Sequence, residues 1–266
     1  ANFNKKIIYA LQHPFQFSNI WSRILNLRKV NSVQNELKEM FQPPKHKIKA
    51  KIYNIEHHRS HIASAFFASR FKNAAILSID GFGDFTSTMT AVGDRNKFRV
   101  LSELNYPHSL GIFYTTLTQF LGFPNYGDEY KVMGLAPYGK NVYEKELAQI
   151  LEITDNGFFR LKKNYFRHFK EGVNMIWDTG SPIIDSLYTR KWSDLFGKPR
   201  LQGSELEQWH IDLATSVQKY TEKVIFHMLD SLHRNTGLDN VCITGGVAQN
   251  SVVNGKILEN TNFKNI

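Results

Sequence analysis

One stretch of the sequence, residues 57–83, constrains the fold more than any other. It begins with a pattern typical of a helix, in which His57 and His61 stand four residues apart. It continues into an apolar run over residues 74–79 that ends in the sequence Asp-Gly-Phe-Gly, starting at Asp80. A helix that leads into a buried strand with an acidic residue at its carboxyl end is typical of α/β domains, which bind ligands at such strand ends.

The segments that follow predict a small meander and a helix. Residues 86–92 and 98–106 alternate between apolar and polar side chains, with turn residues between them. Ser109 is placed to cap a helix over residues 110–121, and Gly122 ends that pattern. The order strand, strand, strand, helix predicts the opening of an α/β actin-like or sugar-kinase-like domain, the ASKHA group with an RNase H-like core.

The second half is organised around a long helix and a buried strand. Apolar residues at helical spacing predict a helix over residues 208–232 that Gly237 stops. Residues 240–244 then predict a strand, which turns at Gly245 and Gly246 into another helix near Gln249. Between the halves we expect a loop over residues 126–139, a helix over 142–153 and an irregular segment over 151–200.

The first residues of the chain are strongly basic. Up to Lys51 they hold ten lysines and arginines against Glu36 and Glu39, so they carry eight of the nine excess positive charges. We interpret them as a solvated helical face, with a partner-binding patch or a nucleic-acid surface as alternatives. A helix is expected over residues 18–40 and a strand over 47–55. The predicted segments are a basic helical one (1–45), a core with the metal motif and the YKVMGLAPYG loop (46–140), an irregular cap or substrate segment (141–205), and the long helix with the GGVAQN turn and its following helix (206–266).

Two histidines and one aspartate form a candidate metal site. On a helix, His57 and His61 face the same way with Cβ atoms about 6 Å apart, and Asp80 adds an oxygen from the end of the next strand. Two nitrogens and one oxygen suit Fe(II), Mn(II) or Zn(II) and leave positions open for substrate oxygens. His58 lies three residues before His61, so it is an alternative contact to the site. The other histidines receive no assignment.

The glycine turns are candidate nucleotide contacts. A strand that ends in Gly245 and Gly246 and runs into a helix exposes backbone N–H groups to a phosphate, although a tight turn without a ligand has the same sequence. Asn250 and Asn254, one turn apart, offer amides to a ribose, a purine edge or a phosphate. The motif after Asp80 adds two further candidates, Gly81 and Gly83.

Lys131 lies in the segment DEYKVMGLAPYG, where acidic residues and glycines surround one cation. Two interpretations are equally consistent with this pattern. Lys131 neutralises a phosphate or carboxylate of the substrate, or it forms an internal ion pair with Asp128 or Glu129.

Composition excludes some classes of protein. No apolar run approaches the roughly 20 residues that cross a bilayer, and the first residues lack the apolar core of a secretion signal, so we expect no membrane association. The single cysteine, Cys242, rules out a disulfide within the chain and fits a cytoplasmic location.

Several long strings, in the same order, resemble one family. They are EHHRSHIASAFF with SIDGFGD, then PHSLGIFYTTLTQFLGFPNYGDEYKVMGLAPYG, and finally ITGGVAQNSVVNGKI. Together they resemble the carbamoyltransferases related to the nodulation protein NodU and the tobramycin-modifying enzyme TobZ. The resemblance covers residues 55–257, and it is weakest in the inserted segment.

The resemblance implies an actin-like domain, akin to the threonylcarbamoyl transferase TsaD, that binds iron and receives a carbamoyl-adenylate. A separate YrdC-like domain, absent from these residues, makes that intermediate from carbamoyl phosphate and ATP. The carbamoyl group then passes to a hydroxyl of a small molecule. The family pattern places the metal at His57, His61 and Asp80, and the nucleotide at Gly245, Gly246 and Asn250. We expect catalysis to involve His57, Asp80 and Lys131.

The family's first strands and a late metal-binding aspartate have no counterpart in residues 1–266. The sequence therefore predicts a central piece of the transferase domain, incomplete at both ends. Two alternatives remain. One is a tRNA threonylcarbamoyl transferase-like protein, which the basic first segment favours and the DEYKVMGLAPYG loop argues against, and the other is a noncatalytic actin-like assembly piece.

Overall fold

The computed structural model describes residues 37, 40, 51–173, 175–176 and 182–266. The basic segment, the helix expected over residues 18–40 and the first half of the strand expected over 47–55 lie outside these residues, apart from the two isolated positions. Residues 51–56 are extended or irregular, so the described part of that expected strand does not form.

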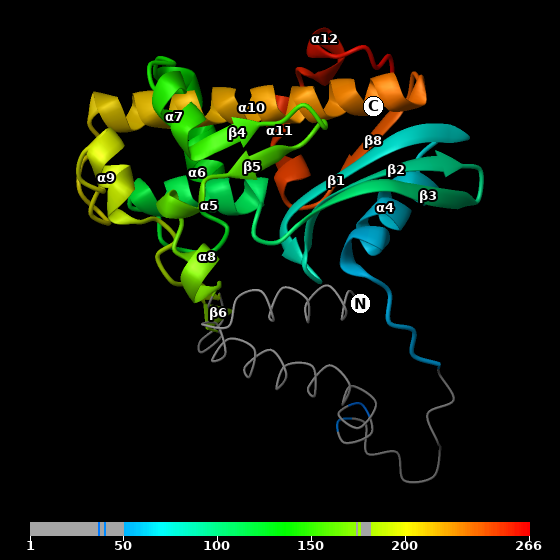
Figure 1. The fold of residues 1–266 in the computed structure, drawn as a ribbon, viewed down its shortest axis with the longest axis horizontal. Coiled ribbons are helices and arrows are strands. Elements are labelled where there is room, and N and C mark those ends of the chain that lie inside the picture. The colour runs from blue at the N-terminus through cyan, green and yellow to red at the C-terminus, as the bar shows by residue number, and fades with distance from the viewer. Residues whose placement is uncertain (1–36, 38–39, 41–50, 174, 177–181) are drawn as a thin grey trace.

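A mixed sheet of four strands forms the centre of the fold, in the order β3-β2-β1-β8 (Figure 1). Strands β1 (Asn73–Gly83), β2 (Thr86–Asp94) and β3 (Lys97–Asn105) form the expected antiparallel meander. Strand β8 (Val241–Thr244) pairs with β1 in parallel, with Ser78 opposite Thr244. The carboxyl ends of β1 and β8 therefore meet at one edge of the sheet.

Helices cover both faces of this sheet, which explains the unbroken apolar run of β1. Ala74 and Ile76 pack with Ile62 and Phe66 of helix α4 (His57–Ala68) on one face. The alternate residues of β1, such as Leu77, join the larger core beneath α5 (Leu110–Phe120) and α10 (Gln208–Thr236) on the other face. The two-sided burial confirms an α/β domain with a mixed sheet.

Capping residues mark the ends of these helices, and two of them, Ser109 and Gly237, were expected from the sequence. The Ser109 hydroxyl accepts a hydrogen bond from the Ile112 N–H at the start of α5. Glu207 and His210 form a reciprocal capping box at the start of α10, and Gly237 ends the helix in the left-handed conformation with φ 63°. Helix α10 runs four residues beyond the expected end at Leu232.

The prediction of a loop over residues 126–139 is wrong, because most of these residues are helical. Helix α6 spans Glu129–Leu135 and a 3-10 turn, η2, spans Ala136–Tyr138. The fully buried side chain of Val132 joins the main core, so tertiary packing outweighs the low helix propensity of Gly134.

The helix expected after Gly246 is interrupted. A 3-10 turn, η4 (Val247–Gln249), comes first, and two single-turn helices follow, α11 (Ser251–Asn254) and α12 (Ile257–Asn260). The break occurs at Asn250, whose side-chain oxygen accepts from the Val253 N–H and starts α11 as its N-cap. Asn250 and Asn254 lie one turn apart, as the N-cap and the last residue of the single turn α11.

The segment between the halves is made of short elements. Helix α7 (Glu144–Ile150) and strand β4 (Leu151–Ile153) replace the single helix expected over residues 142–153. A cluster of aromatic rings around Trp192 joins the segment to α5 through Phe120. The remaining elements are β5 (Phe159–Leu161), η3 (Lys163–Tyr165), α8 (His168–Glu171), β6 (Met175–Ile176), β7 (Ile183–Ile184) and α9 (Arg190–Phe196).

Within the described residues, no helix is both long enough and apolar enough to pass through a lipid bilayer.

Candidate metal centre and adjoining cavity

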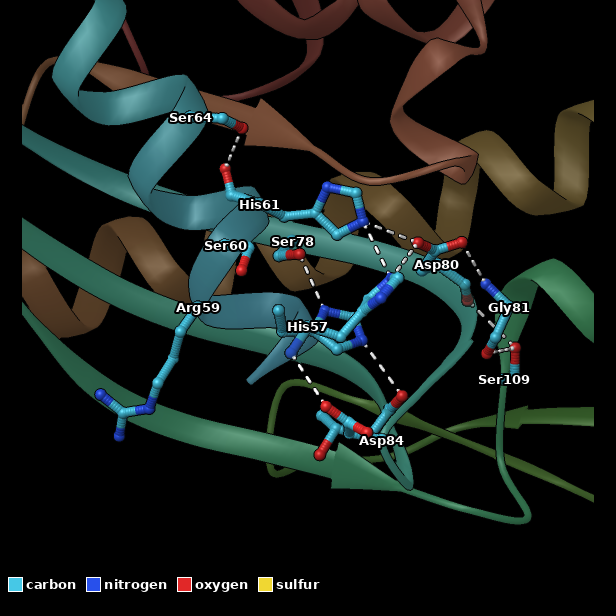
Figure 2. A network of polar contacts seen from close by, with 12 residues as sticks. His57, Arg59, Ser60, His61, Ser64, Ser78, Asp80, Gly81, Asp84 and Ser109 are labelled. Carbon is cyan, nitrogen blue, oxygen red and sulfur yellow. Dashed lines mark hydrogen bonds and ion pairs between the residues drawn. The ribbon is translucent and has the colours of Figure 1, made fainter. Parts of the chain in front are cut away.

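The structure brings His57, His61 and Asp80 together at the end of β1 (Figure 2). The Nε2 atoms of His57 and His61 lie 3.0 Å apart, and they lie 3.0 and 2.9 Å from Oδ2 of Asp80. Ligands about 2.1 Å from an ion and at right angles to one another are roughly 3 Å apart. The three atoms therefore match one triangular face of an octahedral coordination shell, the arrangement of two histidines and one carboxylate that suits Fe(II).

Local structure aims these side chains at one point. The first turn of α4 is capped by Glu56, whose carboxylate accepts from the Arg59 N–H at 2.8 Å. Four residues separate the two histidines, so both project from the same face of α4 toward Asp80. All three side chains remain partly exposed, so the centre is open to solvent.

His58 does not join this group. Its ring is fully buried and points into the sheet, where Nδ1 lies 2.8 Å from Oγ of Ser78 and Nε2 lies 3.1 Å from the carbonyl oxygen of Thr86. Both ring nitrogens of His58 thus form polar contacts that join α4 to β1 and β2. Burial lowers the pKa of His58, which favours its neutral form.

Asp80 and His57 each stabilise the charged form of the other. Burial alone would raise the pKa of the Asp80 carboxyl, but hydrogen bonds from His57, the Gly81 N–H and His61 bring it well below its usual range. The hydrogen bond to Asp80 raises the pKa of His57 despite partial burial. Asp80 is therefore ionised at neutral pH and available to a cation.

Glycines surround the end of β1 because a Cβ atom would not fit there. A Cβ on Gly246 would lie 2.8 Å from Oδ1 of Asp80, and one on Gly111 would lie 2.8 Å from Cα of Gly81. Gly245 has φ 96° and packs against the backbone of Ile79. The turn after β8 can therefore approach the Asp80 carboxylate closely.

A cavity of about 480 Å³ adjoins the centre between β1, α5, α6 and η4. Of the predicted site residues, Asp80, Gly81, Gly246 and Asn250 line it. Tyr126 and Tyr130 contribute exposed rings to its wall. Among the described lining residues there is no lysine, arginine or histidine. The other lining residues are Gly111, Tyr114, Thr115, Gly127, Glu129, Met133, Val247 and Gln249.

Glu129 is a candidate site residue that the sequence interpretation missed. Apart from Asp80 it supplies the only carboxylate among the described residues of the cavity wall, and its Oε1 accepts from the Thr115 hydroxyl at 2.6 Å. The sequence treated Glu129 only as a pairing partner for Lys131. Because residues 126–139 were predicted to form a loop, the sequence did not indicate that Glu129 faces a cavity at the start of α6.

Lys131 does not line the cavity. Its Nζ lies 2.6 Å from Oδ1 of Asp128 and sits 5.4 Å from the centre of the Phe123 ring. The hydrogen bond to Asp128 raises the pKa of Lys131. The internal ion pair, one of the two interpretations open from the sequence, is the arrangement present here.

The remaining nucleotide candidates are mostly engaged within the protein. The Asn254 amide donates to the carbonyl of Ala248 at 2.7 Å, and Asn254 does not line the cavity. In the turn itself, the N–H groups of Ala248 and Gln249 donate to the carbonyls of Gly245 and Gly246. The phosphate interpretation of this turn stays a prediction, and fewer of its donors remain available than the sequence suggested.

Comparison with known proteins identifies a family. A family model described as Carbamoyltransferase N-terminus matches residues 17–266. The nodulation protein NolNO of Sinorhizobium fredii is 34% identical over 218 residues, which cover 82% of this chain and 28% of that protein. The nodulation protein NolO of Bradyrhizobium diazoefficiens is 33% identical over 213 residues, 80% of this chain and 34% of that protein.

An uncharacterised protein of Synechocystis is 41% identical over 213 residues, which cover 79% of this chain and 32% of that protein. The chain therefore spans about a third of the length of the curated relatives it matches.

Proposed function

Because the chain belongs to the carbamoyltransferase family, we propose that it forms the part of the enzyme in which a carbamoyl group is transferred to the acceptor molecule. In this proposal the carbamoyl group comes from a carbamoyl-adenylate and passes to a hydroxyl of a small molecule. A YrdC-like domain would make the adenylate from carbamoyl phosphate and ATP. The observation that carries the proposal is the convergence of His57, His61 and Asp80 beside the cavity.

The ligand set fits a divalent cation, with iron as the first choice. The three ligand atoms lie about 3 Å apart, as one ion bound to all three requires. When bound, such an ion would polarise the carbamoyl carbonyl and make the acceptor hydroxyl more acidic. His57 and His61 would hold it from α4, and Asp80 from β1.

The cavity is the proposed seat of the reacting groups. In the transfer, a bond would form between the acceptor oxygen and the carbamoyl carbon, the bond from that carbon to the phosphate oxygen of AMP would break, AMP would leave, and the hydroxyl proton would pass to water. The Glu129 carboxylate, fixed by Thr115, would accept the hydrogen bond of the acceptor hydroxyl and orient it. A wall without cationic side chains among its described residues favours a neutral or cationic acceptor, and it would leave the negative charge of the adenylate phosphate to the bound cation and to backbone N–H groups.

The fold supports a more specific assignment. Three antiparallel strands followed by a parallel fourth, with helices on both faces, are compatible with part of an actin-like core. We therefore extend the proposal to a TsaD-like domain of that class. The convergence of these three ligands favours a catalytic domain over a purely structural assembly piece.

Anaerobic loading with Fe(II), followed by metal analysis, tests the proposal. We expect the chain to retain about one iron, and the His57→Ala/His61→Ala double variant to lose it. A matched double variant, His227→Ala/His233→Ala on α10, should retain iron. Iron uptake that is unchanged in the first variant would remove the site. Transfer to a hydroxyl compound, measured after a YrdC-like domain is added with carbamoyl phosphate and ATP, tests the reaction itself.

A further inference from the structure

The turn between β1 and β2 contacts the first residues of α4 at three points. The Gly83 Cα lies against the His57 ring, so closely that a Cβ would overlap it. Oδ2 of Asp84 accepts a hydrogen bond from the His57 backbone N–H at 3.2 Å (Figure 2). The carbonyl oxygen of Thr86 lies 3.1 Å from Nε2 of the buried His58. Residues 83–86 thus hold His57 by its ring, its backbone and its neighbour.

This turn has an unusual backbone. Asp84 and Phe85 have φ 55° and 90°, in the left-handed region that residues with a side chain rarely adopt. Such conformations are strained, and they persist where the surroundings fix them. Here the Phe85 carbonyl accepts from the Tyr106 N–H at 2.8 Å, and the two rings pack 5.8 Å apart.

The two glycines of the Asp-Gly-Phe-Gly motif therefore differ in their surroundings. Gly81 lines the cavity, and nothing lies within 4 Å of the position a Cβ would take. Gly83 is buried beneath the His57 ring, which leaves no room for a phosphate. Only the first glycine can serve a ligand.

From these contacts we infer that residues 83–86 position His57, and that Asp84 is a positioning residue for the metal centre. The inference rests on the proposed metal function. The hydrogen bond from the His57 N–H to Asp84 fixes the first turn of α4. The absence of a side chain at Gly83 leaves room for the imidazole ring of His57. Together they hold Nε2 of His57 3.0 Å from Asp80.

Co(II) titration of the full chain, followed by visible absorption, tests the inference. Asp84→Ala should lower the affinity about tenfold or more, as loss of a group that orients a metal ligand does. Asp84→Asn keeps an acceptor without the charge, so its affinity should stay close to that of the wild type. Gly83→Ala should weaken binding and change the spectrum because His57 is displaced.

Two controls separate positioning from general effects. Glu56→Ala removes another cap of α4, whose carboxylate accepts from the Arg59 N–H, and Gly134→Ala places a methyl group in open space on α6, outside the metal centre. Gly134→Ala should bind Co(II) as the wild type does, and Glu56→Ala should lose much less affinity than Asp84→Ala. Equal losses of Co(II) affinity in Glu56→Ala and Asp84→Ala would mean that Asp84 only stabilises α4. Equal losses in Asp84→Asn and Asp84→Ala would mean that Asp84 acts only through its charge. Either result, or normal binding by Gly83→Ala, overturns the inference.

Amide hydrogen exchange without metal provides a second, independent readout. The His57 N–H should exchange slowly in the wild type, Asp84→Asn and Glu56→Ala, and faster in Asp84→Ala. Unchanged exchange in Asp84→Ala would overturn the inference even if cobalt binds. If the wild type binds no cobalt, the proposed metal function fails, and exchange alone decides the role of the turn.

Discussion

Gln218 and Asn250 join their side-chain amides in a reciprocal pair. Nε2 of Gln218 donates to Oδ1 of Asn250 at 3.1 Å, and Nδ2 of Asn250 donates to Oε1 of Gln218 at 2.9 Å. The Tyr114 hydroxyl also donates to Oε1 of Gln218 at 3.0 Å. The pair ties the middle of α10 to the cap of α11, and so fixes the turn that follows Gly245 and Gly246.

Replacing Asn250 with alanine should destabilise the fold. The change removes both hydrogen bonds between Asn250 and the Gln218 amide, which is only 2% exposed and keeps Tyr114 and Glu222 as partners, and it removes the cap of α11. Together these losses lower the free energy of unfolding by about 1–3 kcal/mol, measured by urea denaturation. Asn260→Ala, at an exposed position, should change it by less than about 0.5 kcal/mol. Similar stabilities for the two variants would contradict this account.

A Cβ at Gly246 should disturb the metal centre without unfolding the chain. The methyl group would lie 2.8 Å from Oδ1 of Asp80, so the carboxylate has to move. We expect Gly246→Ala to lower Co(II) affinity about tenfold or more, measured by titration. Gly134→Ala is the control, because it lies in α6 with open space around it and should stabilise the helix by up to about 1 kcal/mol. Full cobalt affinity in Gly246→Ala would show that the contact does not matter.

Glu129→Gln should reduce carbamoyl transfer and leave iron binding intact. The amide keeps the size of the side chain but loses the charge that would orient an acceptor hydroxyl in the cavity. We expect kcat/KM to fall at least about tenfold, or about 1.4 kcal/mol of transition-state stabilisation. Glu152→Gln removes an exposed carboxylate on β4, outside the cavity, and should leave kcat/KM unchanged. Wild-type transfer by Glu129→Gln would exclude the proposed role.

His168 should make the fold sensitive to mild acid. Its ring is fully buried, Nε2 lies 2.8 Å from the Pro107 carbonyl oxygen, and Nδ1 has no hydrogen-bond partner among the described residues. Burial lowers the pKa of His168 from 6.5 to about 4. Below pH 6.5, His168 is protonated in the unfolded chain but stays neutral in the folded chain. Its contribution to the free energy of unfolding is therefore fully present above that pH and falls as the pH drops toward 4.

The loss from this histidine amounts to about 2 kcal/mol between roughly pH 7.5 and pH 5. Urea denaturation at the two pH values measures it. His168→Gln keeps a donor for the Pro107 carbonyl but does not titrate, so its stability should depend less on pH by that amount. An equal dependence in both proteins would show that His168 does not titrate in this way.

The sequence predicted the parts of the fold whose local signals agree with their burial. The apolar run of β1, the Ser109 cap and the left-handed Gly237 each has a local cause, and the structure has them where expected. Helix α6 was missed because its glycine and aromatic residues favour a loop locally, and only packing of Val132 into the core stabilises the helix. The short elements between α7 and α9 depend likewise on long-range aromatic contacts.

The same distinction applies to the candidate site. The spacing of His57 and His61 fixed their shared face, and the end of a strand fixed Asp80, so their convergence was expected. Gly83 was interpreted as a ligand contact because the sequence does not show which side chain packs over a glycine. Glu129 was missed because its neighbours across the cavity, such as Thr115 on α5, come from another element.

The parallel pairing of β1 with β8 affects the order in which the chain folds. Ser78 lies beside Thr244, and Gly246 touches Asp80, although more than 160 residues separate the partners in the sequence. Closing so long a stretch of chain is entropically costly, and contacts of this kind form slowly. The meander of β1 to β3 needs no such closure, so we expect it to fold early and the edge that bears Asp80 and Gly246 to assemble late. In a chain in which β8 has not yet paired with β1, His57 and His61 would therefore already lie near Asp80, while Gly246 would not yet contact the Asp80 carboxylate.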